Sequence, residues 1–397
     1  MTGPTSSASR RARASVAVAV LLGVLALAAG CASFPDASGQ PWRDKPDIGA
    51  ERAPQPRQPG SGEPSTPPPP AGGSGQTAPN GCVDPDPQVV ATCLAPVSAV
   101  ITLPGASAAL VAERTTGRIL RIAPDQPPQT VATVTVDATG DGGLTGLALS
   151  PTYAEDQLVY AYATTTGGNA VLRVAPGDTA KPVVTGIPGG SSGNRGALGV
   201  EPDGTLLVAT GDAGDAAAAS APGSLAGKLL RVDPFGRPAR GNPDAASPIV
   251  GSGLHAPGDV CPDPMNATTW VTDRAGGRDV LLSVRPGAVP GAAAAATPAW
   301  TWPDRPGVAG CAVGSGVLLV SLTDAAGLFV LRPTSSGFVG PPETVLQNTY
   351  GRFSGADLGA DGLIWVGTVN KDGAGPGPTD DRVIRIRPPS GGSAGAE

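Results

Sequence analysis

The chain has 397 residues, a formal net charge of −6 at pH 7, and charged side chains at only 15% of its positions. Such an acidic chain offers no basic patch to a phosphate backbone, so the composition argues against nucleic acid as a partner. Its 58 glycines and 45 prolines favour short strands and loops over helices. We therefore expect an all-β fold.

The first 30 residues have the pattern of an export signal. Arg10, Arg11 and Arg13 form a basic region before an apolar run of 14 residues, 16–29, and about 20 residues are needed for a spanning helix. The run ends in Leu-Ala-Ala-Gly-Cys, 27–31, which resembles the lipobox of bacterial lipoproteins. That resemblance implies a signal peptide over 1–30, cleavage before Cys31, and diacylglycerol on its thiol as the membrane anchor.

The resemblance predicts an exported protein that is lipid-anchored to the outer face of the bacterial cytoplasmic membrane. The alternative is a plain secretory signal in which Cys31 occurs by chance. The paired arginines lack the rest of a twin-arginine motif, so the export route stays open.

Residues 31–81 predict a tether and not a domain. They contain PQPRQPGSGEPSTPPPPAGGSG at 54–75 and almost no apolar pattern. A segment of this kind cannot bury enough apolar surface to offset its ordering entropy. We expect a disordered Pro/Gly-rich linker over 31–81, a folded domain over 82–390, and a flexible tail over 391–397.

Four cysteines remain for the folded domain, and an even number in an oxidising compartment predicts two disulfides. Of the three possible pairings we favour Cys82–Cys93 with Cys261–Cys311. The first would fasten the start of the folded domain, and the second would close a loop of about 50 residues. A metal site is the weaker interpretation, because no CxxC spacing is present.

The folded domain contains a sixfold repeat. Short apolar segments that contain arginine and end in proline close at positions 124, 176, 234, 286, 333 and 388, at spacings of 47 to 58 residues. Strand–turn–strand patterns centred on Asp-Gly precede some of them, as in LGVEPDGTLLVATGD at 198–212. Six units of four short strands predict a six-bladed β-propeller. A two-sheet sandwich is the alternative, but it would leave the regular unit length unexplained.

In a propeller, the loops at one end of the inner strands gather around a central channel. Polar residues beside the strongest strands are therefore the candidates for a site. They are Asp141, Asn194, Arg195, Asp212, Asp215, His255, Asp273, Arg274, Asp279, Asn370, Lys371 and Asp372. Arg114 either forms a structural ion pair or lines the channel. Aspartates in turns commonly bond to their own backbone, which is the alternative to cation binding at Asp212 and Asp215.

Six ordered segments resemble the glucose/sorbosone dehydrogenases. They are AERTTGRILRI (112–122), GDGGLTGLALSP (140–151), LGVEPDGTLLVATGDAGD (198–215), SLAGKLLRVDP (224–234), SPIVGSGLHAPGDVCPDP (247–264) and DRAGGRDVLLSVRPG (273–287). The resemblance implies a six-bladed propeller that uses pyrroloquinoline quinone (PQQ) and calcium. In that family a histidine takes the proton of a sugar hydroxyl while hydride passes to the quinone.

The resemblance also assigns places to individual residues. The family's histidine position falls on Gly193, and its arginine position on His255. The calcium loop falls near Asp279, which is therefore a candidate metal ligand. The Asp-rich turn GDAGD at 211–215 adds Asp212 and Asp215 as candidate metal ligands. The candidate cofactor or ligand contacts are Arg114, Asp141, Asn194, Arg195, His255, Asn370 and Lys371.

His255, the only histidine, is the candidate catalytic residue, and the alternative is an ordinary loop histidine. The sequence thus predicts an oxidoreductase-like propeller with altered catalytic motifs. The alternative is a non-catalytic propeller that binds a carbohydrate or protein ligand at the cell envelope.

Overall fold

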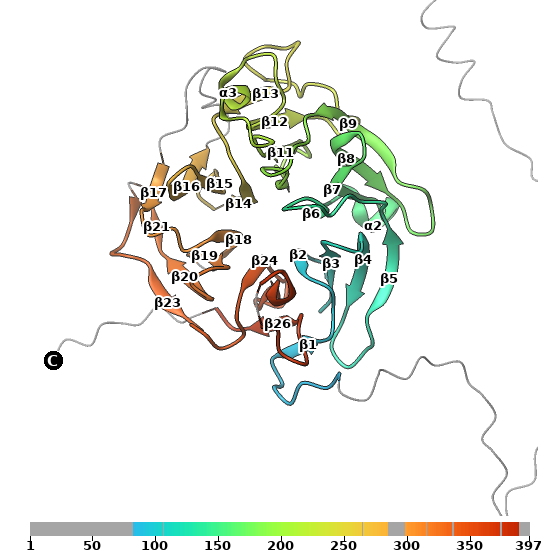
Figure 1. The fold of residues 1–397 in the computed structure, drawn as a ribbon, viewed down its shortest axis with the longest axis vertical. Helices are drawn as coiled ribbons and strands as arrows, with labels where there is room; N and C mark the ends of the chain where they lie inside the picture. Colours follow the sequence, from blue (N-terminus) through green and yellow to red (C-terminus); the bar gives the residue numbers. More distant parts are fainter. Residues whose placement is uncertain are drawn as a thin grey trace, which may run out of the picture. The chain divides into compact units, whose positions relative to one another are not determined.

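The computed structural model describes residues 82–388 except 106, 264, 285–297, 315, 336 and 374. The predicted signal peptide, Cys31, the linker over 31–81 and the tail over 391–397 lie outside the described residues. Six four-stranded antiparallel sheets surround a central axis (Figure 1). The predicted six-bladed β-propeller is confirmed.

The first three blades follow one another in chain order. Blade 1 comprises β2 (Val97–Thr102), β3 (Ala109–Glu113), β4 (Arg118–Ile122) and β5 (Gln129–Thr133). Blade 2 comprises β6 (Leu144–Leu149), β7 (Val159–Thr165), β8 (Gly168–Val174) and β9 (Lys181–Ile187). Blade 3 comprises β10 (Gly196–Val200), β11 (Leu206–Thr210), β12 (Lys228–Val232) and β13 (Ile249–Ser252).

The last three blades include one strand from the start of the domain. Blade 4 comprises β14 (Pro257–Asp263), β15 (Thr268–Ala275), β16 (Arg278–Val284) and β17 (Pro298–Trp302). Blade 5 comprises β18 (Val308–Gly314), β19 (Val317–Leu322), β20 (Gly327–Leu331) and β23 (Glu343–Val345), with the hairpin β21 (Pro333–Thr334) and β22 (Gly337–Phe338) before its last strand. Blade 6 comprises β24 (Phe353–Leu358), β25 (Ile364–Thr368), β26 (Val383–Ile386) and β1 (Val89–Ala91).

The arginine- and proline-containing repeats coincide with the third strands of the six blades, which are β4, β8, β12, β16, β20 and β26. Each sequence unit therefore ends after the third strand of a blade. The fourth strand of that blade lies in the next sequence unit. The last unit has no successor, so β1 supplies the fourth strand of blade 6 by pairing with β26. This exchange joins the two ends of the domain and leaves no open seam in the ring.

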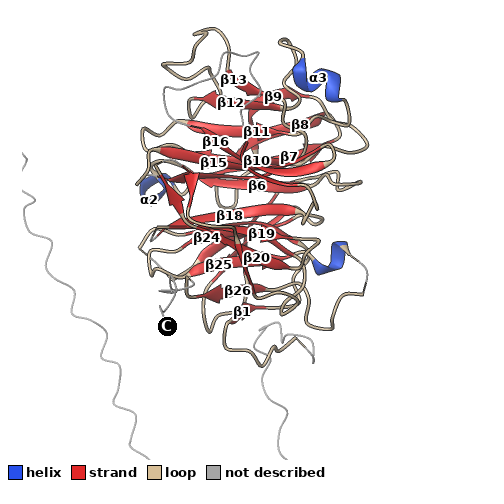
Figure 2. Cartoon of the chain, turned by 90° about the vertical axis from the view of Figure 1, so that its left-hand side faces the viewer, coloured by secondary structure: helices blue, strands red, loops and turns tan. Residues whose placement is uncertain are grey.

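The first strand of each blade lies innermost and packs against the first strand of the next blade. β24 packs against β2 in the same way, which closes the ring. Apolar side chains fill the spaces between blades, so strands such as β3 and β11 are buried on both faces. The helical segments lie in connecting loops: α2 (Tyr153–Asp156), α3 (Ala216–Ser220) and the 3₁₀ turn η1 (Asn370–Asp372) (Figure 2). No helix in the described part of the chain is long and apolar enough to cross a membrane.

Both predicted disulfides are confirmed. Cys82–Cys93, with a Cα–Cα distance of 5.6 Å, fastens the segment that carries β1. Cys261–Cys311, with a Cα–Cα distance of 6.1 Å, joins β14 to β18 and so connects blades 4 and 5 near the channel.

Candidate functional site

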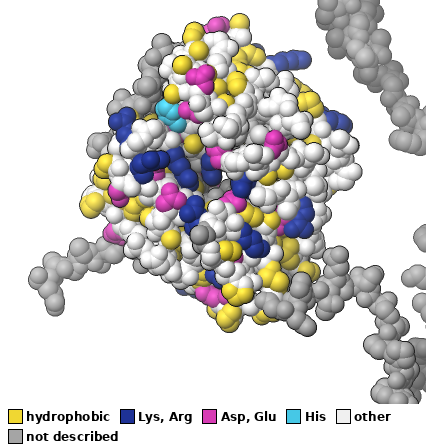
Figure 3. Space-filling view, in the orientation of Figure 1, with side chains coloured by type: hydrophobic (Ala, Val, Ile, Leu, Met, Phe, Trp, Pro, Cys, Tyr) yellow, Lys and Arg dark blue, Asp and Glu magenta, His cyan; other side chains and the backbone are white. Residues whose placement is uncertain are grey.

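Neighbouring strands in each blade are antiparallel, so the start of the first strand and the end of the second meet at one rim of the channel. Four arginines reach this rim from different blades. Arg114 follows β3, Arg195 precedes β10, Arg274 lies near the end of β15, and Arg352 precedes β24. Figure 3 shows basic side chains gathered with carboxylates around the central hollow on this face. We call this arginine-lined rim the basic funnel.

Arg114 is fixed by several contacts inside the protein. Its Nε and Nη2 donate to the two carboxylate oxygens of Asp372, each at 2.7 Å, and its Nη1 donates to Gly142 O at 2.6 Å. These contacts join blades 1, 2 and 6. Arg114 thus forms a structural ion pair, which is one of the two alternatives that the sequence left open, and it directly follows the end of β3.

Arg195 and Arg352 differ from Arg114 because each has a buried Nε that finds no hydrogen-bond partner among the residues that the structure describes. Burial lowers the pKa of Arg195 to about 10, and the positive charge of Arg274 acts in the same direction. Arg352 retains an ion pair with Asp324 at 3.2 Å. A guanidinium with an unpartnered donor beside other positive charges favours an anionic ligand.

Arg274 anchors the opposite wall of the funnel. Its Nε donates to Val308 O at 2.8 Å, and its Nη2 donates to Thr323 Oγ1 at 2.8 Å. Burial lowers the pKa of Arg274, while the carboxylate of Asp324 opposes that shift. Since these contacts tie β15 to blade 5, Arg274 holds the funnel together and adds positive charge to it.

Asp141 and Asn194 shape the loop before β10. The Asp141 carboxylate accepts from the backbone N–H groups of Gly193 at 3.0 Å and Asn194 at 3.2 Å. The Asn194 side chain is buried and exchanges hydrogen bonds with both backbone groups of Gly190. The Asn194 side chain therefore fixes this loop through its hydrogen bonds to the Gly190 backbone.

His255 forms a pair with Asp212 at the edge of the funnel. Its Nδ1 lies 2.9 Å from Asp212 Oδ2, and 30% of the histidine side chain is exposed. The two residues are also joined through the backbone, because Asp212 N donates to His255 O at 2.9 Å. The backbone N–H of His255 donates to the buried carboxylate of Asp273, and burial raises the pKa of that carboxyl group. An ionised carboxylate only accepts, so Asp212 favours the tautomer with the proton on Nδ1 and leaves Nε2 free to act as a base.

Position 193 lies against this pair and has room only for glycine. Gly193 has φ +67°, and a Cβ there would lie 2.3 Å from Asp212 Oδ1 and 2.7 Å from Gly214 N. A side chain at this position would therefore displace the carboxylate that holds His255.

The three predicted metal ligands do not come together. Asp215 caps α3 through the backbone N–H groups of Ala217 and Ala218, and Asp279 accepts from the N–H groups of Gly307 and Val308. Asp212 is bound to His255 and to Gly214 N. Among the described residues, the one group of metal-ligating side chains is Asp259, Cys261 and Cys311, whose sulfurs are bonded to each other. The described side chains therefore do not form a calcium site of the predicted kind.

Asn370 and Lys371 lie on η1 at the blade 6 side of the funnel. Asn370 Oδ1 accepts from Arg352 N at 2.7 Å, and Lys371 Nζ donates to Leu94 O at 2.6 Å. Their neighbour Asp372 holds Arg114. The turn thus joins two funnel arginines to the N-terminal segment.

The sequence prediction missed Arg352 and its partner Asp324. A usable signal was present, because Arg352 directly precedes the first strand of its blade, as Arg195 does, and Asp324 closely follows a second strand. No motif drew attention to them. Their role depends on charges supplied by other blades.

The opposite end of the channel is mostly apolar. A cavity of about 450 Å³ is lined there by the later residues of all six innermost strands. Asp259 and Asp357 lie in its wall and accept hydrogen bonds from the backbone of the next blade, Asp259 from Cys311 N and Asp357 from Thr102 N. These two carboxyls brace neighbouring blades.

Comparison with known proteins agrees with the fold and the ordered motifs. The family model for glucose/sorbosone dehydrogenase matches residues 95–287. A crystal structure of an oxidoreductase described as a glucose dehydrogenase, from Thermus thermophilus, is 30% identical with a TM-score of 0.67, and the match covers 75% of this chain and 98% of that one.

The chain belongs to the glucose/sorbosone dehydrogenase family.

Other solved structures in this fold are also similar to it. The PQQ-bound aldose sugar dehydrogenase of Streptomyces coelicolor is 28% identical with a TM-score of 0.68, and the match covers 75% of this chain and 96% of that one. The soluble aldose sugar dehydrogenase of Escherichia coli, at 19% identity and a TM-score of 0.65, shares the fold over 76% of this chain and 98% of its own. None of the curated proteins matches the chain.

Proposed function

We propose that this member of the glucose/sorbosone dehydrogenase family is a lipid-anchored oxidoreductase that binds PQQ in the basic funnel and oxidises a sugar hydroxyl. The Nε groups of Arg195 and Arg352, which are buried and have no hydrogen-bond partner within the described part of the chain, carry the proposal. They lie at the rim of the channel in a chain that is otherwise acidic.

The funnel fits a quinone that bears several carboxylates. Carboxylate oxygens would supply the missing acceptors at Arg195 and Arg352, and arginine binds planar carboxylates well. When bound, PQQ supplies an acceptor for the electrons that leave the substrate. Calcium has no corresponding set of side-chain ligands among the described residues, so no step here depends on it.

The His255–Asp212 pair is the proposed proton acceptor. Asp212 would keep the Nδ1 proton in place, and the partly exposed His255 side chain would then offer Nε2 to a substrate hydroxyl. Alcohol oxidation requires removal of the hydroxyl proton while hydride leaves the carbon atom that bears the hydroxyl group. The adjacent positive charges of the funnel would stabilise negative charge that develops on the substrate oxygen and the acceptor.

Titration and turnover of the full chain test this proposal. We expect stoichiometric uptake of PQQ, followed by sugar-dependent dye reduction with at least one member of an aldose panel. His255→Gln should lower turnover about 10²- to 10⁴-fold with little change in the Kd for PQQ. Arg195→Gln should instead raise the Kd. Arg237→Gln is the matched control, because Arg237 is exposed and follows the end of a third strand, at the opposite rim.

A binding propeller is the second candidate function. The observation that favours it is Gly193, because the family's histidine position has no room for a side chain here. Uptake of PQQ or a sugar without any dye reduction, in both the wild-type chain and His255→Gln, would support binding alone. No uptake at tens of micromolar would refute the quinone proposal.

The lipid anchor is part of the same proposal and is supported by the sequence around Cys31. When the chain is expressed in a bacterial host with labelled palmitate, the wild-type chain should carry the label. The Cys31→Ser variant should remain unlabelled and be absent from the membrane fraction. Label on the serine variant, or an unlabelled wild-type chain, would argue for the plain secretory signal.

A further inference from the structure

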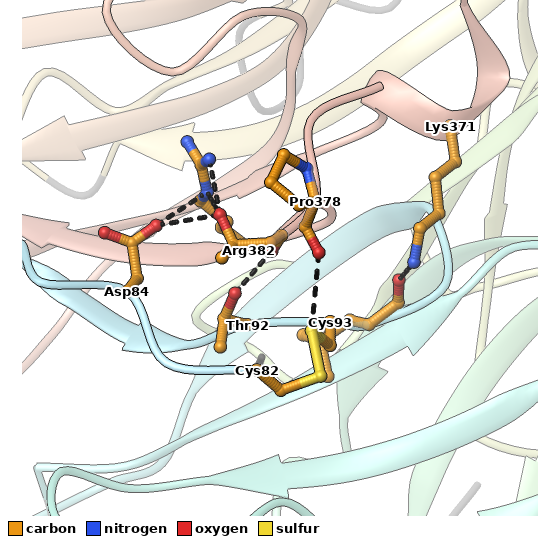
Figure 4. The surroundings of a disulfide bond; sticks show 9 residues. Cys82, Asp84, Thr92, Cys93, Lys371, Pro378 and Arg382 are labelled. Carbon is orange, nitrogen blue, oxygen red and sulfur yellow. Dashed lines mark hydrogen bonds and ion pairs between the residues drawn. A yellow bond between two sulfur atoms is a disulfide. The ribbon is translucent and has the colours of Figure 1, made fainter. Parts of the chain in front are cut away.

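The segment that leads into the propeller is bound tightly to the loop that carries Lys371 and Asp372. We call residues 82–94, closed by the Cys82–Cys93 disulfide, the N-terminal clasp, and residues 369–382, between β25 and β26, the closing loop. Figure 4 shows the disulfide beside Pro378, Arg382 and Lys371 of the closing loop. These contacts are additional to the pairing of β1 with β26.

Backbone hydrogen bonds fix the clasp against the closing loop. Cys93 N donates to Thr379 O at 3.1 Å, and Thr92 Oγ1 donates to the same carbonyl. Leu94 and Asp381 exchange two backbone hydrogen bonds, each at 3.0 Å. Asp84 adds an ion pair with Arg382 at 2.9 Å.

From there the contacts continue into the basic funnel. The buried Asp381 carboxylate accepts from the N–H groups of Asn370 and Lys371, so it holds the η1 turn. Lys371 Nζ donates to Leu94 O of the clasp, and the Asp372 carboxylate accepts two hydrogen bonds from Arg114. Each step from the disulfide to a funnel arginine is a direct contact.

We propose that the N-terminal clasp is a positioning element of the funnel: the Cys82–Cys93 disulfide fixes Lys371 and Asp372, and through Asp372 it fixes Arg114 at the rim where the anion would bind. The effect on PQQ rests on the proposed function, whereas the effect on the closing loop does not. Because both cysteines are partly exposed while Cys261 and Cys311 are buried, a thiol reductant reaches the clasp first. Two external thiols then become one disulfide, and Cys82 and Cys93 become free thiols.

The test compares two variants of the full chain that each lack one disulfide. Cys82→Ser with Cys93→Ser opens the clasp, and Cys261→Ser with Cys311→Ser is the matched control at the other end of the channel. We expect the Kd for PQQ to rise at least about tenfold in the clasp variant and to change less than about twofold in the control. Hydrogen exchange at the backbone amides of Asn370 and Lys371 should also become faster in the clasp variant alone.

A second measurement covers a clasp variant that fails to fold. Mild thiol treatment of the folded wild-type chain, with mass mapping to confirm that only Cys82–Cys93 has opened, should produce the same two changes. The Asp372→Asn substitution, made in both the intact and the opened chain, tests whether the clasp acts on Arg114 through Asp372. If the clasp acts through Asp372, opening it in that background should cost little further affinity.

An unchanged Kd together with unchanged exchange in the opened chain would overturn the proposal. If the wild-type chain takes up no PQQ, the proposed function fails, and hydrogen exchange at Asn370 and Lys371 still decides whether the clasp holds the turn. A full additional loss of affinity in the Asp372→Asn background would refute the path through Arg114.

Discussion

Replacing Gly193 by alanine should destabilise the propeller strongly, although the change adds only one methyl group. Gly193 has φ +67°, a left-handed conformation that costs an L-residue roughly 1–2 kcal/mol. Its Cβ would also lie 2.3 Å from Asp212 Oδ1, a distance that forces the Asp212 carboxylate to move. Overpacking of this kind costs about 1–3 kcal/mol.

Together these contributions predict a loss of about 2–5 kcal/mol in the free energy of unfolding. Gly177→Ala is the matched control, because Gly177 has φ +73° but no atom within 4 Å of the added Cβ. The control should therefore lose only the conformational contribution of roughly 1–2 kcal/mol. The difference between the two variants measures the contact with the Asp212 pair.

Urea unfolding of both variants, followed by circular dichroism, gives the two free energies. Equal losses in Gly193→Ala and Gly177→Ala would show that the loop tolerates a side chain at position 193. A histidine could then be accommodated there, and the steric reason for placing the base at His255 would be lost.

Three further predictions concern the site and the channel. Asp212→Asn should lower turnover while leaving the Kd for PQQ within about twofold, because it disturbs the tautomer of His255 and not the arginines; equal turnover would dismiss the pair. Removing Cys261–Cys311 opens a loop with a separation of 50 residues and should cost about 4 kcal/mol of unfolding free energy in the chain-entropy model; a loss below about 1 kcal/mol in urea unfolding would contradict this. Burial raises the pKa of Asp259 to about 7, above its value of about 3.9 in an unfolded chain. Between these two values the folded state binds more protons than the unfolded state. The free energy of unfolding should therefore fall as the pH rises from about 4 to 7, by at most about 4 kcal/mol. Asp259→Asn should remove that fall, and an identical pH profile for the variant would refute the assignment.

Much of the architecture could be read from the sequence because it depends on local patterns that recur. The repeated segments ending in proline marked the third strand of every blade, and Asp-Gly turns marked hairpins such as β10–β11. The favoured disulfide pairing, one of three that four cysteines allow, was also confirmed. The role of β1 was not predictable in this way, because its three residues carry no distinctive pattern and pair with a strand almost 300 residues later.

The candidate site, like the fold, was predictable only in the features that depend on local sequence. Individual polar residues at strand ends could be identified from the sequence, and Arg114, Arg195, Asn370 and Lys371 do lie at one rim. Their partners could not be identified, so Asp212 and Asp279 were assigned to metal when one holds His255 and the other holds backbone N–H groups. Which atoms a carboxylate meets depends on segments from other blades, and no local pattern encodes that.

The sequence by itself therefore determined the six repeats and the position of the lone histidine, and it favoured the disulfide pairing and the family resemblance that were later confirmed. Only the tertiary structure decided that arginines from four blades converge and that His255 pairs with Asp212 beside a glycine that has no room for a side chain. It also decided that Arg195 and Arg352 keep a buried donor for which the described residues supply no acceptor. The physical reason is that strand patterns arise between neighbours in the chain, whereas charge convergence and steric exclusion arise only when the ring closes and brings distant loops together.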